Sequence, residues 1–66
     1  MVKCNHHPMF AVEILADCLE NLGVENKIIE GAIMIDVEAL KKVKKSEMPH
    51  FVFMNYDWIM KCAAES

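Results

Sequence analysis

The alternation of apolar and polar positions is clearest between residues 26 and 36, where two short apolar runs flank a turn. The runs cover residues 27–29 and 33–35 and are rich in isoleucine, a β-branched residue that strands favour. Between them lies Glu30-Gly31, and glycine readily adopts the positive φ that a tight two-residue connection requires. The pattern predicts a β-hairpin.

A helical pattern precedes this hairpin. Pro8 suits the first position of a helix, and Gly23 suits the left-handed conformation that closes one, so we expect a helix over residues 8–22. At about 100° per residue its polar side chains form one narrow stripe, and apolar side chains fill the remainder. Such a wide apolar surface is buried either between the sheet and another helix of the chain or in a dimer seam. Phe10 projects into the polar stripe, where it either folds over the helix start or is an exposed contact residue.

After the hairpin, Asp36 is a good N-cap residue, and the pattern predicts a helix over residues 37–45 with lysines toward its end. Residues 46–49 read as a loop. Residues 51–54 are apolar at every position, which predicts a strand that is covered on both faces. Asn55 is then expected to cap a final helix over residues 56–64.

Residues 1–4 add a short first strand, so the expected order is strand, helix, strand, strand, helix, strand, helix. The first six elements match the ferredoxin-like β-α-β-β-α-β sandwich, and the seventh is an additional C-terminal helix. The fold class is therefore α/β in the α+β sense, with one domain over residues 1–66. Both main helices of that plan cover one face of the sheet, and we expect the C-terminal helix or a second subunit to cover the other.

Composition indicates a need for a partner. Apolar residues make up 55% of a chain of 66 residues, and a domain of this size leaves much of its surface facing water. The net charge of −3 and the absence of arginine argue against nucleic acid as a partner, because phosphate contacts need clustered basic residues. No run approaches the length of a membrane span. The three cysteines cannot all pair within one chain, which favours a cytoplasmic location with free thiols.

The densest group of potential metal ligands is Cys4, His6 and His7. Thiolate and imidazole bind zinc and copper. In this stretch the chain resembles the heavy-metal-associated domain, with Cys4 at the first ligand position of that family's Cys-x-x-Cys pair and His7 at the second. The resemblance implies a soft-metal carrier for zinc or copper. The alternative is that both histidines are ordinary polar residues at a helix entrance.

We do not expect an enzyme. Both glycines already have turn roles, so no phosphate-binding loop is available, and a Cys-His pair such as Cys4 with His50 arises easily by chance. The lysines of residues 41–45 complement the negative end of their helix dipole; the alternative is contact with phosphate or an acidic protein surface.

Aromatic residues and methionines gather near the C-terminus, and such residues are enriched at interface centres. We therefore expect a small, non-enzymatic protein-binding module of the regulator, inhibitor or adaptor type, without a cofactor, that acts as a homodimer or on a larger target. The alternative function is the soft-metal carrier. For Trp58, the alternative to an interface role is packing against the second face of the sheet. The expected apolar anchors are Trp58, Tyr56, Met60, Phe53 and Phe10.

Overall fold

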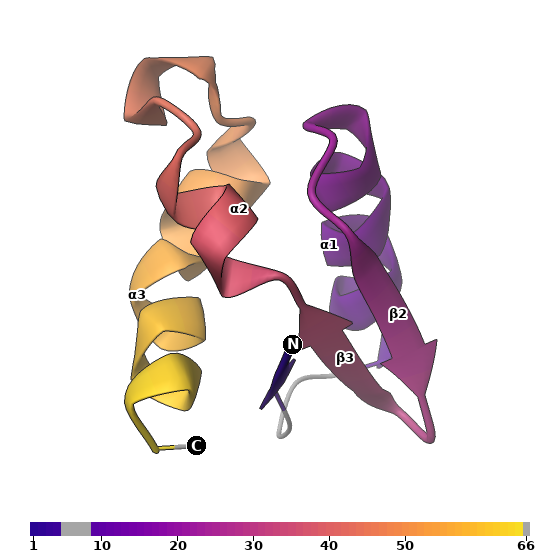
Figure 1. Cartoon of the computed structure of the whole chain (residues 1–66). Helices are drawn as coiled ribbons and strands as arrows, with labels where there is room; N and C mark the ends of the chain where they lie inside the picture. Colours follow the sequence, from indigo (N-terminus) through magenta and orange to yellow (C-terminus); the bar gives the residue numbers. More distant parts are fainter. Residues whose placement is uncertain (5–8, 66) are drawn as a thin grey trace.

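The computed structural model describes residues 1–4 and 9–65, and for Met9 and Phe10 it describes the backbone only. The described residues form three strands, α-helices and one short 3-10 turn, in the mixed α+β arrangement of Figure 1. In chain order the elements are β1 (Val2–Cys4), α1 (Met9–Asn21), β2 (Asn26–Ile29), β3 (Ala32–Ile35), α2 (Val37–Lys41), η1 (Lys45–Glu47) and α3 (His50–Glu65).

The three strands form one sheet in the order β1-β3-β2. The central strand β3 is antiparallel to both neighbours, so β1 and β2 run in the same direction. Helix α1 connects these two parallel strands, and β3 lies between them, which is the split β-α-β arrangement. The first strand, the first helix and the hairpin are therefore confirmed.

The hairpin turn has the geometry that its sequence indicates. Glu30 and Gly31 connect β2 to β3 with φ values of 51° and 80°. Positive φ at both central residues defines a type I′ turn, whose twist matches the twist of the flanking strands. Ile28 consequently lies opposite Ile33, and the register of β2 against β3 follows from this turn.

Gly23 ends α1 in the predicted left-handed conformation, with φ 76°. Its N–H donates to the Glu20 carbonyl at 3.0 Å, and the Val24 N–H donates to the Leu19 carbonyl at 2.9 Å. This pair of bonds is a Schellman motif. Leu19 and Val24 are both buried, so the motif also directs the chain from α1 into the sheet.

The predicted strand over residues 51–54 is wrong, because these residues form the first turns of α3. The Phe53 N–H donates to the Pro49 carbonyl at 3.0 Å, which is the first bond of the helix. Asn55 is inside the helix and does not cap it; its side-chain amide donates to the Phe51 carbonyl at 2.7 Å. In the described part of the chain the sheet has no fourth strand, and the complete ferredoxin-like plan is not confirmed.

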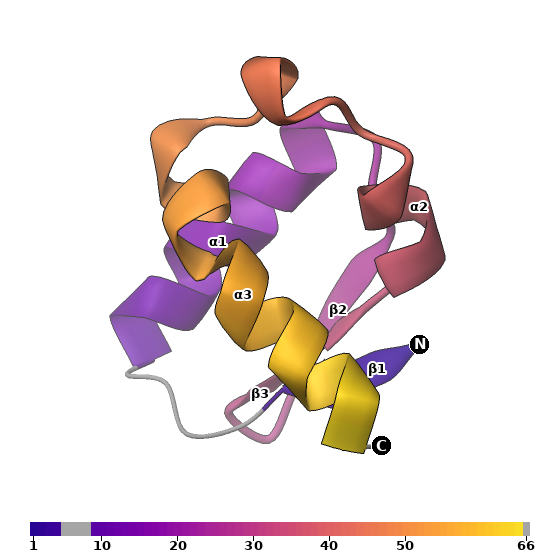
Figure 2. The ribbon, with the colours of Figure 1, turned by 90° about the vertical axis from the view of Figure 1, so that its left-hand side faces the viewer.

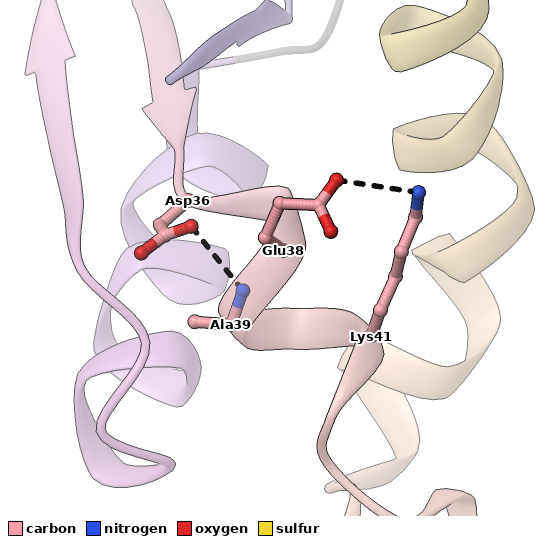
Figure 3. Close-up of polar contacts among 4 residues, drawn as sticks. All are labelled: Asp36, Glu38, Ala39 and Lys41. Carbon is pink, nitrogen blue, oxygen red and sulfur yellow. Dashed lines mark hydrogen bonds and ion pairs between the residues drawn. The ribbon is translucent and has the colours of Figure 1, made fainter.

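Helix α2 begins as predicted and ends early. The Ala39 N–H donates to Oδ1 of Asp36 at 3.2 Å (Figure 3), which is an N-cap bond. The helix stops at Lys41 instead of residue 45. Four lysines within residues 41–45 repel one another at helical spacing, which accounts for the early end. Part of the predicted loop over residues 46–49 is the 3-10 turn η1.

The core lies between the sheet and two helices. Helix α1 packs against β2, β3 and α3, and α3 also packs against β1; Figure 2 shows α3 beside the first strand. The polar stripe of α1 is exposed and its opposite side is buried, so this helix is covered by the sheet and another helix of its own chain. The side chains with the least exposed surface are Cys4, Val12, Leu15, Leu19, Ile33, Ile35, Leu40, Val52 and Ile59.

The second face of the sheet is more polar than expected. The register places Lys3 and Lys27 on either side of Met34, and these side chains point away from the face that carries Cys4 and Ile33 because strand residues alternate. Helix α3 packs on the Cys4 face through buried Val52 and Ile59. The C-terminal helix therefore does not cover the second face.

The capping bond of Asp36 provides a test of α2. Asp36→Ala removes the acceptor for the Ala39 N–H and should lower the free energy of unfolding by about 1 kcal/mol in urea denaturation. Asp36→Asn keeps an acceptor and should retain most of the stability. The neighbouring Glu38–Lys41 ion pair spans 3.6 Å between exposed side chains (Figure 3), so Glu38→Ala should cost roughly 0.5 kcal/mol or less. Equal losses for Asp36→Ala and Glu38→Ala would contradict the assignment of the cap.

Candidate functional site

Helix α3 carries most of the residues that the sequence indicates as contacts. It is the longest element, with 16 residues, and its inner side is fixed by Val52 and Ile59, which have no exposed surface. These two residues are separated by about two turns and so share one helix face. That anchoring determines which other side chains of α3 face solvent.

The outer side of α3 has a polar ridge with an apolar flank on each side. At about 100° per residue, His50, Asp57 and Lys61 point away from Ile59, and all three are exposed. Most positions on either side of this ridge are apolar, with Glu65 at the end of the helix as an exception. One flank carries Phe53, Tyr56 and Met60, and the other carries Met54 and Trp58.

The five apolar residues of these flanks differ in exposure. Phe53 is 51% exposed and Met54 is 67% exposed. Tyr56, Trp58 and Met60 are half-buried and pack against the core. The two most exposed side chains are therefore adjacent in the N-terminal half of α3, while the other three show only part of their surface.

The predicted anchors are thus only partly brought together. Phe53, Tyr56 and Met60 share one flank of α3, whereas Trp58 is on the other. Phe10 belongs to α1, and its side chain lies outside the described structure. Met54, at 67% the most exposed of these side chains, was not among the predicted anchors, because its exposure follows only once residues 50–54 are helical.

The lysine-rich segment has partners within the chain. Nζ of Lys45 lies 5.2 Å from the centre of the Tyr56 ring, which is a cation–π contact. Lys41 pairs with Glu38. The cation–π contact places η1 beside the flank of α3 that carries Tyr56. The cation–π contact and the ion pair are both consistent with a structural role for Lys45 and Lys41.

The metal hypothesis falls largely on residues that the structure does not describe. His6 and His7 lie outside the described residues, and Cys4 is at the end of β1 with 1% of its surface exposed. Among residues 1–4 and 9–65, no group of three or more Cys, His, Asp or Glu side chains could hold a metal ion. Zinc or copper binding through Cys4, His6 and His7 stays a prediction.

The structure instead brings Cys4 together with Cys62 of α3. Their thiols are hydrogen-bonded to each other, and both cysteines belong to the core cluster or its edge. Burial, followed by the hydrogen bond and the charge of Cys62, raises the pKa of Cys4 to about 12. Cys4 is consequently a protonated thiol at neutral pH. The sequence gives no local signal for this pair because its members come from the first strand and the last helix.

Comparisons with family models, curated proteins and solved structures find no match to this chain. No helix in the described part of the chain has the length and apolar character needed to cross a membrane.

The Cys4 thiol should make stability depend on alkaline pH. The folded chain holds this proton up to a pKa of about 12, while the ordinary thiol value is 9.0. Above pH 9 the unfolded chain releases the proton first, so stability falls as pH rises from 9 toward 12.

The measurement is urea unfolding of the wild type and Cys4→Ala between pH 8 and pH 11. The wild type should lose stability relative to the variant, with a slope difference of at most about 1.4 kcal/mol per pH unit. Parallel pH profiles would show that Cys4 does not hold its proton in this way.

Proposed function

We propose that this chain is a small protein-binding module that acts as a homodimer through the Phe53 flank of α3, defined as Phe53, Tyr56 and Met60. The observation that carries the proposal is the 51% exposure of Phe53 beside two half-buried residues that are typical of interface centres. A large aromatic side chain in water is unfavourable, and a second molecule can remove that surface from solvent.

The arrangement of the flank supports a specific contact. Positions 53, 56 and 60 follow the i, i+3, i+7 spacing of residues that dock a helix face onto a partner. Tyr56 and Met60 are already held against the core, so little side-chain entropy is lost when their remaining surface is covered. The Lys45 contact with the Tyr56 ring further fixes one border of the flank.

The polar ridge favours one relative orientation of the two copies. Asp57 and Lys61 on the ridge carry opposite charges, so a second copy related by two-fold symmetry can place the lysine of one ridge near the aspartate of the other. Such exposed ion pairs contribute more to the alignment of the two copies than to the strength of binding. Burial of Phe53 supplies the affinity.

Self-association is tested by light scattering and sedimentation over a range of protein concentrations. The wild type should form dimers, and Phe53→Asp should raise the dimer Kd by at least about tenfold, because truncation of a central aromatic anchor typically has this effect or more. Circular dichroism checks that the variant keeps its helices, as expected for a change at an exposed position.

Ile14→Asp is the matched control, since Ile14 is an exposed apolar residue of α1 with 44% exposure. This variant should dimerise as the wild type does. A wild type that stays monomeric at every concentration would refute the homodimer. A loss from Ile14→Asp as large as that from Phe53→Asp would refute the assignment of the interface to α3.

A further inference from the structure

We propose that Cys4 and Cys62 form a reversible disulfide, a covalent modification site that links the first strand to the last helix. The Cys4 thiol is hydrogen-bonded to Cys62, and both cysteines belong to the core cluster or its edge. The strand and the helix that carry them, β1 and α3, pack against each other. Cys18 lies on α1, a third element.

The surroundings favour a disulfide as the product. Cys4 is among the least exposed side chains of an apolar core, where a charged thiolate is costly. A disulfide carries no charge, so its formation removes two thiol protons without leaving an ion inside the protein.

The reaction needs an oxidant, and a small-molecule disulfide supplies it. Cys62 is only half-buried, so its thiolate can attack one sulfur of the oxidant; a Cys62 mixed disulfide forms and one small thiolate leaves. Cys4 then loses its proton and attacks the Cys62 sulfur, which releases the second small thiol. The two cysteine sulfurs lose two electrons, and the oxidant gains them as it becomes two thiols.

Cross-linking should also strengthen the fold. The bond closes a loop that contains nearly the whole chain, and longer loops give a larger reduction in the entropy of the unfolded state. The thermal midpoint of the oxidised protein should rise by on the order of 10 °C relative to the reduced protein. A dithiol reductant should reverse the change.

The test uses the full chain with Cys18→Ala, treated under native conditions with glutathione disulfide and analysed by intact mass and non-reducing peptide mapping. The expected product has lost two hydrogens, contains no glutathione, and links the peptide of Cys4 to that of Cys62. The wild type should give the same link. Dithiothreitol should restore the reduced mass.

Cys62→Ala is the matched variant, and it changes the half-buried member of the pair, so the core position Cys4 is left intact. With both Cys18 and Cys62 replaced, the chain should give no internal link and show no thermal shift. The proposal is overturned if the Cys18→Ala protein stays reduced, retains glutathione as a lasting mixed disulfide, or links only between molecules. It is also overturned if the wild type forms its internal bond through Cys18.

Discussion

Ile33 and Ile35 on the central strand have no exposed surface, because α1 and α3 together cover the sheet face to which they point. The apolar face of this three-stranded sheet is stabilised when helices remove it from water. The turn at Glu30-Gly31 sets the register of β2 against β3, and strand alternation then determines which isoleucines point to the helices. The rest of the structure depends on this one-sided burial.

The other sheet face combines charged and apolar side chains. Lys3 and Lys27 flank Met34 across neighbouring strands, and their long aliphatic stems can cover apolar surface while the charges stay hydrated. Ile29 lies on the same side of β2 as Lys27 and is 41% exposed. Helix α3 instead packs beside α1 on the opposite face of the sheet.

Sequence reasoning succeeded where a signal is contained in adjacent residues. Gly31, Gly23 and Asp36 each determine a turn or a cap through their own backbone or side-chain chemistry, and this turn and these two caps were predicted correctly. Residues 51–54 were mispredicted because a short apolar run fits a buried strand and a helix equally well. The deciding feature is the shared burial of Val52 and Ile59, which becomes visible only when both are placed on one continuous helix.

The candidate site shows the same division between local and distant information. Composition pointed to the aromatic residues of the C-terminal segment, but their grouping into two flanks follows from the longer α3. The Cys4–Cys62 contact could not be predicted, since the residues around each cysteine carry no signal for a contact with the other. Both features depend on the same placement of α3: its inner side brings Cys62 to the first strand, while its outer side keeps Phe53 in solvent. Because the two lie on different sides of the helix, a cross-link at Cys62 would fix α3 in place without covering the surface that we assign to binding.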